Sequence, residues 1–274
     1  MRSLPTLPAH DMSAAPTPPT AATIPLAELF IAARRDHRRF SPDAAAGEPR
    51  TADDAYRVQD AVARELGWFD AARPSAWKTG APDRAAVPIA APLPAALLRM
   101  SPARFDAREF HTIGIEAEIA LRFHSDVDAA LACSPGFDWA AVIGEMRVGI
   151  EVVDSRIDDA GSAPALLKLA DFQQNGAYVI GTGVPYRGDV DWTTLRARVR
   201  RNGAVIADTR GGHPLGDPTW LLPWFVRHVE ARCGGVRAGD LVTLGTWAGL
   251  LPAACGERIH VEFDGVGQAS VDFT

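Results

Sequence analysis

The stretch FHTIGIEAEIALRF, residues 110–123, has the pattern of a half-buried β-strand. It nevertheless carries two carboxylates, and the explanation for them bears on both the fold and the function. Side chains alternate between the two faces of a strand, so Glu116 and Glu118 share one face while the apolar residues around them share the other. Their Cα atoms lie about 7 Å apart, and the charges repel each other unless solvent or a cation intervenes. The stretch therefore predicts either an amphipathic strand with a solvated face or a cation site that takes a further ligand from elsewhere.

A third carboxylate lies inside the apolar run RVGIEVVDSRI, residues 147–157. This residue, Glu151, stands between two β-branched side chains, and a buried carboxylate without a partner costs several kcal/mol or takes up a proton. One interpretation is a buried ion pair with Arg147 or Arg156. The other is that Glu151 joins the two glutamates of the first stretch. Three carboxylates without a thiolate or imidazole favour a hard divalent ion such as Mg²⁺, which leaves positions open for a chelating substrate.

Composition narrows the class of protein. The chain has 274 residues, of which 47% are hydrophobic and 23% charged, as in an average globular protein. Its net charge is −6 and it has no basic block, which argues against a nucleic-acid partner. No apolar run is long enough for a transmembrane helix, so no membrane partner is expected. The three cysteines lack CxxC spacing, which fits a cytoplasmic location and indicates neither a zinc site nor a disulfide framework.

The first hundred residues differ in character from the rest. Residues 1–23 are rich in Pro, Ala and Thr without periodicity and are expected to be a disordered leader. Residues 24–102 are expected to form a small helical N-terminal portion. The elements predicted there are helices over 24–40 and 51–68, a short strand at 76–80 and a loop over 81–102.

Residues 103–274 are predicted to form a strand-rich domain, because short strand-like runs follow one another between Gly, Pro and Asp residues. The pair Asn202-Gly203 between two alternating runs is typical of a tight hairpin. One helix interrupts the strands at 217–235, with Asp217 as its N-cap and with Pro223 tolerated only in the first turn. A helical portion followed by a strand-rich domain gives an α+β fold.

Several motifs, taken together, resemble the fumarylacetoacetate hydrolase superfamily, and most closely its 2-keto-4-pentenoate hydratase and 4-oxalocrotonate decarboxylase branch. The resemblance covers most of the chain from about residue 51 onward. GIEAEIAL is similar to the ExE metal motif of the family, and IEVVDSRI to the segment that holds its third metal carboxylate. The remaining similar segments are DDAYRVQDAV, WKTG, GDPTWLLPWF and GGVRAGDLVTLGTWAG. The resemblance implies a mixed β-roll.

The resemblance also implies a site. Mg²⁺ or Mn²⁺ would be held by Glu116, Glu118 and Glu151, and a small 2-oxo acid would bind through its carboxylate and keto oxygens. Lys78, in WKTG, matches the family's active-site lysine and would pair with the substrate carboxylate or move a proton; a surface lysine at a strand end is the alternative. Thr246 would contact the substrate carboxylate, unless it is simply a turn residue.

Two segments depart from the family pattern. The hydratases carry an acid in a PDYG-like segment that helps to activate water, but residues 87–97, VPIAAPLPAAL, contain none. Asp83 and Asp106 are the nearest acids, at spacings that do not match. The family segment ADNAS is ADFQQ here, residues 170–174. The resemblance therefore implies catalytic roles for Asp171 and for Gln174, whose longer side chain donates a hydrogen bond in place of the serine hydroxyl.

These residues lead to one main hypothesis and three alternatives. The main hypothesis is a divalent-metal-dependent lyase of the hydratase type that acts in the breakdown of aromatic compounds. The protein is expected to form a homo-oligomer. The first alternative is a 2-oxo-3-enedioate decarboxylase, which needs no activated water. The second is an acylpyruvate hydrolase, which uses a histidine; His111 is the candidate, although its position favours a loop residue. The third is a non-catalytic partner subunit, because hydratase and decarboxylase subunits pair in this branch.

Overall fold

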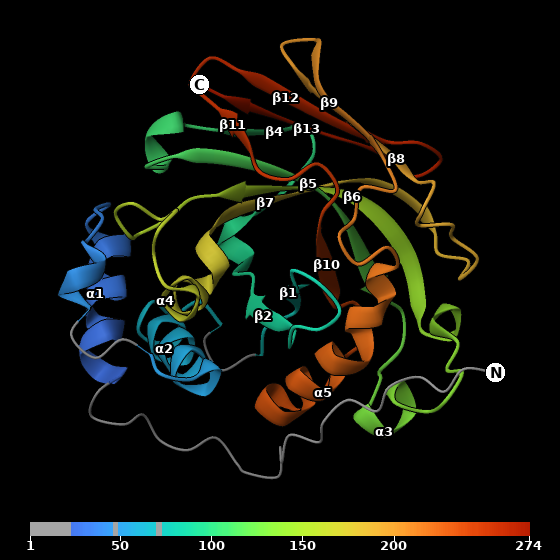
Figure 1. Cartoon of the computed structure of the whole chain (residues 1–274), viewed down its shortest axis with the longest axis horizontal. Coiled ribbons are helices and arrows are strands. Elements are labelled where there is room, and N and C mark those ends of the chain that lie inside the picture. Colours follow the sequence, from blue (N-terminus) through green and yellow to red (C-terminus); the bar gives the residue numbers. More distant parts are fainter. Residues whose placement is uncertain (1–22, 46–48, 70–72) are drawn as a thin grey trace.

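The computed structural model describes residues 23–45, 49–69 and 73–274. The expected leader, residues 1–23, lies outside the described residues except for Thr23, where the first helix begins. Figure 1 shows a smaller sheet stacked on a larger, curled sheet, whose other face looks toward helices. The chain is thus an α+β protein with a mixed β-roll and a small helical portion at its N-terminal side, as the sequence predicts.

The helical portion contains the two predicted helices. Helix α1 spans Thr23–Arg35 and α2 spans Ala52–Glu65. The α2 N-cap is Thr51, whose hydroxyl and the Asp54 carboxylate bond each other's backbone N–H groups in a capping box. With the short helix α4 (Ala165–Ala170), α1 and α2 enclose a separate apolar cluster. The largest fully buried side chains of this cluster include Phe30 and Phe172.

The larger sheet contains parallel and antiparallel pairs, and its strands follow the order β2-β1-β10-β5-β6-β7-β3. Strand β11 pairs with the first residues of β5. Its central strands β5, β6 and β7 are each 11 residues long. Their length gives the sheet room to curl (Figure 1). The strands are β1 (Ala76–Gly80), β2 (Ile89–Pro92), β3 (Leu98–Met100), β5 (Ile113–Phe123), β6 (Ile143–Val153), β7 (Asn175–Pro185), β10 (Leu241–Thr246) and β11 (Leu251–Ala253).

The expectation of a loop over residues 81–102 is wrong at β2 and β3, which are edge strands of the larger sheet. Both are short, and β2 ends in Pro92, a residue that only an edge strand or a strand end tolerates because it cannot donate to the ladder. These features hide a strand from a search for alternating runs. Strands β1 and β3 precede residue 103 and still pair with strands of the later part of the chain, β10 and β7.

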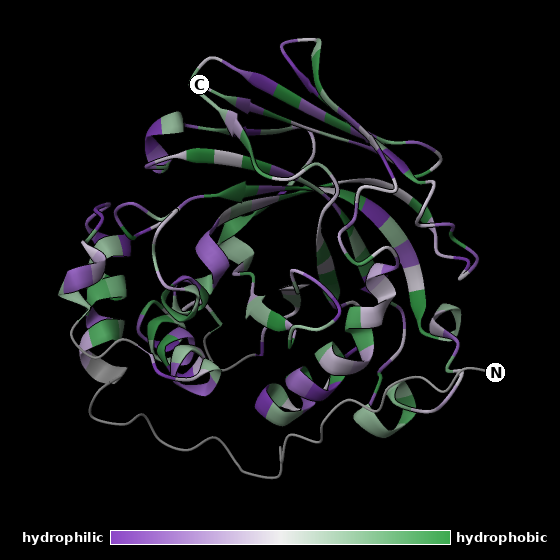
Figure 2. Cartoon of the chain, viewed as in Figure 1, coloured by the Kyte–Doolittle hydropathy of each residue, from purple (hydrophilic) through white to green (hydrophobic). Residues whose placement is uncertain are grey.

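The smaller sheet has the order β4-β13-β12-β8-β9 and covers the apolar face of β5 and β6. Figure 2 shows hydrophilic and hydrophobic segments alternating along its strands, as expected for a sheet with one face in solvent. The hairpin turn at Asn202-Gly203 has positive φ at both residues, as predicted. The strands are β4 (Ala103–Phe105), β8 (Arg196–Arg201), β9 (Ala204–Arg210), β12 (Arg258–Phe263) and β13 (Gly267–Phe273).

Two further helices, α3 (Ala129–Ala132) and α5 (Leu222–Cys233), pack against each other beside the larger sheet. Asp217 caps a short 3-10 turn, Pro218–Leu221, that leads into α5, so Pro223 falls in the first turn of the helix. Gly234 ends α5 in the left-handed conformation. Among the described residues, no helix is long and apolar enough to cross a membrane.

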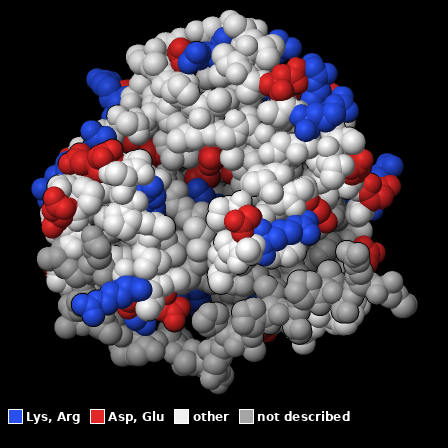
Figure 3. Space-filling view, viewed as in Figure 1, with Lys and Arg blue, Asp and Glu red and all other residues white. Residues whose placement is uncertain are grey.

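One face of β5 is buried between the two sheets, so only its other face is available for a functional site. Ile115 and Ile119 are fully buried in the cluster that also contains Val261 and Phe263 of the smaller sheet. Because side chains alternate, the glutamates of β5 lie on the opposite, concave face of the larger sheet. Figure 3 shows a hollow near the middle of the molecule, with acidic and basic atoms at its bottom.

Candidate metal centre

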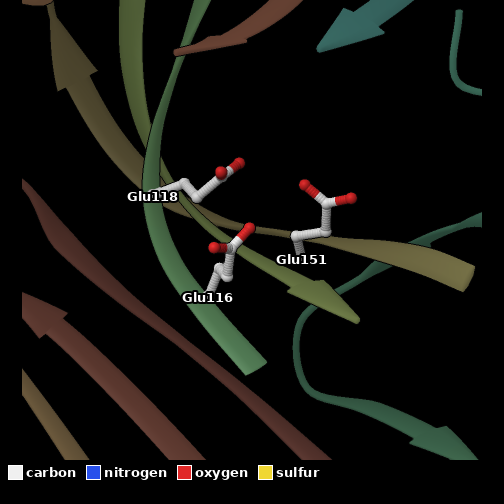
Figure 4. A group of neighbouring side chains, drawn as sticks. All are labelled: Glu116, Glu118 and Glu151. Atoms are coloured by element: carbon white, nitrogen blue, oxygen red, sulfur yellow. The ribbon is translucent and has the colours of Figure 1, made fainter. Parts of the chain in front are cut away.

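Three glutamates converge on the concave face of the larger sheet. Glu116 on β5 lies directly across from Glu151 on β6, and Glu118 lies two residues further along the same face of β5. One carboxylate oxygen from each lies within 4.8 Å of the other two. Figure 4 shows the three side chains pointing toward one another from the two strands. Glu118 and Glu151 are buried, whereas Glu116 is partly exposed and faces the open side.

The pKa values of the cluster show that it has too little positive charge to keep all three carboxylates ionised. Burial and the neighbouring Glu151 raise the pKa of Glu116 to about 7, against the opposing effect of Lys78. Burial raises the pKa of Glu118 well above its ordinary value, and the other two glutamates raise it further. A cation among the three oxygens would reverse these shifts by favouring the ionised carboxylates.

Lys78 provides the one cationic side chain in contact with the cluster among the described residues. Its Nζ donates to Glu151 Oε1 at 2.5 Å and to the backbone carbonyl of Gln173 at 3.2 Å. Burial lowers the pKa of Lys78, but the three glutamates outweigh burial and the net shift is upward. Lys78 is therefore not a surface lysine, and it stays protonated at neutral pH.

The predicted alternative for Glu151, an ion pair with an arginine, is wrong in its partners. Arg156 pairs with Asp171 at 2.8 Å, and Arg147 pairs with Glu145 at 2.7 Å. Lys78 takes the place of an arginine at Glu151, and it does so at one carboxylate oxygen only. Three ionised carboxylates against a single ammonium leave two negative charges, which is the charge that one divalent cation neutralises.

One atom in the cluster lacks a partner. Glu151 Oε1 accepts from Lys78 and also from Asn175 Nδ2 at 3.0 Å. Glu151 Oε2 is buried and has no hydrogen-bond partner among the described residues. An unsatisfied buried carboxylate oxygen costs free energy unless a missing group compensates it. This oxygen, the all-oxygen donor set and the charge balance together fit a hard divalent ion.

A hydroxyl pair holds Glu118 in place. The Thr243 hydroxyl, on β10, donates to Glu118 Oε2 and accepts from Tyr178 Oη at 2.9 Å. Gly149 makes this possible, because a Cβ at that position would lie 1.8 Å from Tyr178 Oη. Sequence reasoning missed Thr243 and Tyr178. Both occupy strand positions on the same face as the glutamates, so strand alternation would have found them once the pairing of β7 and β10 was known.

Thr246 lies beside the cluster, paired in register with Glu118. Its hydroxyl donates to the carbonyl of Gly249 at 3.2 Å and accepts from the backbone N–H of Ala248 at 3.3 Å. The Trp247 N–H donates to the carbonyl of Ala117, which fixes the turn against β5. The substrate contact of Thr246 stays a prediction, at a position adjoining the glutamates.

Asp171 and Gln174 flank the turn that contacts Lys78, but their own side chains do not contact the glutamates. The buried Asp171 carboxylate accepts from Arg34 at 3.1 Å and from Arg156 at 2.8 Å, which gives it a structural role. Gln174 lines a cavity next to the cluster. The intervening turn brings the carbonyl of Gln173 to Lys78 instead. The catalytic roles of Asp171 and Gln174 remain predictions.

The other candidate residues do not contact the glutamates. Asp83 accepts from the backbone N–H groups of its own turn, and Asp106 pairs with Arg108. His111 stacks on His37 with ring centroids 4.3 Å apart. No acid of residues 87–97 and no histidine therefore completes a water-activating group at the cluster within the described part of the chain.

The sequence of the chain is similar to those of known proteins. The model of the family described as fumarylacetoacetate (FAA) hydrolase C-terminal matches residues 79–274. The 2-keto-4-pentenoate hydratase 1 of Dechloromonas aromatica is 32% identical over 126 residues, which cover 45% of this chain and 47% of that relative. The 2-hydroxyhexa-2,4-dienoate hydratase of Comamonas testosteroni is 29% identical over 58% of this chain and 59% of its own. The chain thus matches about half to three fifths of the length of these curated relatives.

A solved structure extends the likeness to nearly the whole fold. The 4-oxalocrotonate decarboxylase from Pseudomonas putida G7, complexed with magnesium and adipate, superposes with a TM-score of 0.79. The superposition covers 92% of this chain and 97% of that chain at 23% identity. A likeness at this identity shows a shared fold.

Proposed function

Because the chain belongs to the fumarylacetoacetate hydrolase family, we propose that it is a divalent-metal-dependent lyase of the hydratase type. Its substrate is a small 2-oxo acid such as 2-keto-4-pentenoate. The observation that carries the proposal is the cluster of Glu116, Glu118 and Glu151, with one buried oxygen of Glu151 left without a partner. Curated relatives that are hydratases support the type of reaction.

The three glutamates would hold Mg²⁺ or Mn²⁺, since all ligand atoms are hard oxygens. When bound, such an ion polarises the keto group of a 2-oxo acid and stabilises negative charge that develops on its oxygen. Few protein ligands leave room for the keto and carboxylate oxygens of the substrate. The partly exposed Glu116 lies on the side from which the substrate enters.

Lys78 acts on the substrate as a proton donor. Its protonated Nζ is held by two acceptors, Glu151 Oε1 and the carbonyl of Gln173. An ammonium has three N–H donors, so one remains for the carboxylate or the reacting carbon of a 2-oxo acid. The elevated pKa keeps this proton in place until charge builds up on the substrate.

The first test is calorimetric titration of Mg²⁺ into the metal-free protein and into Glu116→Ala and Glu151→Ala variants. We expect both variants to lose measurable binding. Asp208→Asn is the matched control, because Asp208 is a carboxylate on β9 that pairs with Arg196 on the smaller sheet. Unchanged Mg²⁺ affinity in both glutamate variants would eliminate the mechanism.

The second test separates the possible reactions. Decarboxylation of a 2-oxo-3-enedioate is the second candidate, because it needs no activated water and residues 87–97 contain no acid that could activate one. The 4-oxalocrotonate decarboxylase of Pseudomonas putida, 28% identical over 58% of this chain, supports it. Ultraviolet absorbance and CO₂ release are followed with both substrates. Hydration without CO₂ release favours the leading proposal, CO₂ release the second, and metal binding without turnover a partner subunit.

A further inference from the structure

Strand β10 presents two threonines to the glutamates, although an odd number of residues separates them. Thr243 pairs with Ala120 on β5, and Thr246 pairs with Glu118. Ala120 and Glu118 lie on the same face of β5, because side chains two residues apart point the same way. Residues directly opposite each other in an antiparallel pair also share a face. Both threonines therefore lie on the concave face that carries the three glutamates.

A β-bulge in β10 makes this arrangement possible. Three steps along β10, from Thr243 to Thr246, match two steps along β5. In a regular ladder Gly245 would lie opposite Glu118, and Thr246 would point toward the smaller sheet. Gly245 has a φ of 98°, in the left-handed region where a side chain would be strained. The bulge therefore decides whether a hydroxyl faces the glutamates at this end of β10.

His213 bonds to the backbone inside the bulge. Leu244 has no register partner on β1 or β5, and its carbonyl accepts from His213 Nε2 at 2.9 Å. The Leu215 N–H donates to His213 Nδ1 at 3.2 Å, so the ring proton lies on Nε2. His213 is only 5% exposed. Burial lowers its pKa, which keeps the ring neutral at pH 7, as these two hydrogen bonds require.

The chain that follows β9 packs closely against the same part of β10. The His213 ring lies on Trp247, with ring centroids 4.5 Å apart. The Thr209 hydroxyl donates to the Trp247 carbonyl at 3.0 Å, and a Cβ at Gly212 would lie 2.3 Å from that carbonyl. Among the described residues, no side chain other than His213 bonds to the carbonyl of Leu244. The smaller sheet is thus linked through His213 to the strand that borders the glutamates.

We propose that His213 is a positioning residue, which holds the bulge that turns the Thr246 hydroxyl toward the carboxylate of a bound 2-oxo acid. The inference rests on the proposed function, because the substrate must be chelated by an ion at the glutamates. Without the His213 donor, the Leu244 carbonyl returns to the ladder and Thr246 turns away. Thr243 lies before the bulge, so its hydroxyl continues to donate to Glu118. His213 therefore acts on the substrate through Thr246 and leaves the metal ligands in place.

The test measures two affinities by calorimetry. One is that of the metal-free protein for Mg²⁺, and the other is that of the Mg²⁺-loaded protein for 2-oxopentanoate. His213→Phe keeps an aromatic ring on Trp247 without the donor, whereas His213→Gln keeps a donor without the ring. We expect His213→Phe to bind 2-oxopentanoate about 10- to 100-fold more weakly, the effect of one charge-assisted hydrogen bond, and Mg²⁺ within about threefold of wild type. His213→Gln should retain most of both affinities.

A double-mutant cycle separates positioning from a general loss of structure. Thr246→Val removes the hydroxyl and should weaken 2-oxopentanoate as much as His213→Phe does. The double variant should show no further loss, because both changes remove the same contact, and additive losses would overturn the inference. Gly245→Ala strains the bulge while His213 is kept, and it should give the same selective loss. This variant tests the inference independently if thermal unfolding shows that His213→Phe does not fold.

The remaining outcomes distinguish this inference from the proposed function. Unchanged affinity of His213→Phe or of Thr246→Val for 2-oxopentanoate would overturn the inference alone. So would a loss of Mg²⁺ affinity in His213→Phe as large as its loss of 2-oxopentanoate affinity, because the effect would then not be confined to the bulge. Failure of the Mg²⁺-loaded wild type to bind 2-oxopentanoate would refute the proposed function, and the inference with it.

Discussion

The unbalanced charge of the glutamate cluster predicts that Glu116→Gln stabilises the metal-free protein and destabilises the metal-bound one. The pKa of Glu116 is about 7 in the folded protein against an ordinary 4.5. A carboxyl whose pKa is raised by folding makes the folded state less stable as pH rises, because the folded state holds a proton that the unfolded state has lost. The cost begins near pH 4.5 and is complete above pH 7.

The size of the effect follows from the shift. A shift from 4.5 to about 7 corresponds to about 3 kcal/mol above pH 7. Since Glu116 is partly exposed and screened by solvent, we expect about 2 kcal/mol of this in the free energy of unfolding. Glutamine keeps the size of the side chain and removes its charge, so the variant should gain this amount at pH 8 and nothing at pH 4.5.

The assay is urea unfolding at several pH values between 4.5 and 8, in chelator and in Mg²⁺. Binding to the folded state alone stabilises wild type by about 2.7 kcal/mol when Mg²⁺ is at about 100 times its Kd, and Glu116→Gln should lose this gain. The order of stability therefore reverses on adding metal. The reasoning is refuted if the variant is less stable than wild type in chelator at pH 8, or if Mg²⁺ stabilises both equally.

Four other results are expected. Mg²⁺ affinity should fall as pH drops below about 7, because Glu116 must release its proton when the ion binds. Calorimetry in two buffers of different ionisation enthalpy measures this proton release. Binding without proton release would contradict the assignment of Glu116 as a ligand. Gly149→Ala should weaken Mg²⁺ binding and stability together, because its Cβ displaces the Tyr178 hydroxyl that supports Glu118 through Thr243; retention of both properties would show that this support is unimportant. Asp171→Asn should lower the free energy of unfolding by about 3–5 kcal/mol, since the buried Arg156 and the largely buried Arg34 lose their shared anion. Urea unfolding measures this change, and a loss under about 1 kcal/mol would exclude it. Burial lowers the pKa of His228 to about 3, so the unfolded state binds a proton that the folded state does not. The free energy of unfolding should therefore fall by about 1.4 kcal/mol per pH unit as pH drops from about 6.5 toward 3. This slope should be absent when His228→Gln is unfolded over the same pH range.

The glutamates could be predicted from sequence because their signal is local. Strand alternation places Glu116 and Glu118 on one face, and an apolar run around Glu151 indicates a buried carboxylate that needs compensation. Neither inference requires knowledge of the strand order. The resemblance to a family then joined the two segments, and the cross-strand pairing of Glu116 with Glu151 confirmed that they meet.

The supporting residues could not be predicted in this way, because their roles depend on register between distant strands. Thr243 reaches Glu118 across 125 positions of the chain. Its hydroxyl alone gives no sign of its partner. Asp171 shows a different problem: the family motif implies a catalytic role, which stays a prediction, but its two arginine partners, Arg34 and Arg156, come from segments outside that motif. A motif identifies a position, and the surrounding segments determine what the side chain does there.

The ion pairs of Asp171 also explain how the fold tolerates a strained turn, residues 172–174, between α4 and β7. Phe172, Gln173 and Gln174 all have positive φ, between 52° and 61°. Non-glycine residues in this conformation cost about 1–2 kcal/mol each, so the turn needs anchoring at both ends. Asp171 anchors one end through its arginines, one of which belongs to α1.

The other end of the turn is held by the sheet. The backbone carbonyl of Gln174 accepts from the Asp154 N–H, and β7 begins at Asn175, whose amide supports Glu151. Held between these points, the turn directs the carbonyl of Gln173 at Lys78 Nζ and leaves the Gln174 side chain at the cavity. Helix α1 therefore contributes to the site without touching it: Arg34 helps to fix the turn that orients Lys78, the only ammonium in contact with the glutamates among the described residues.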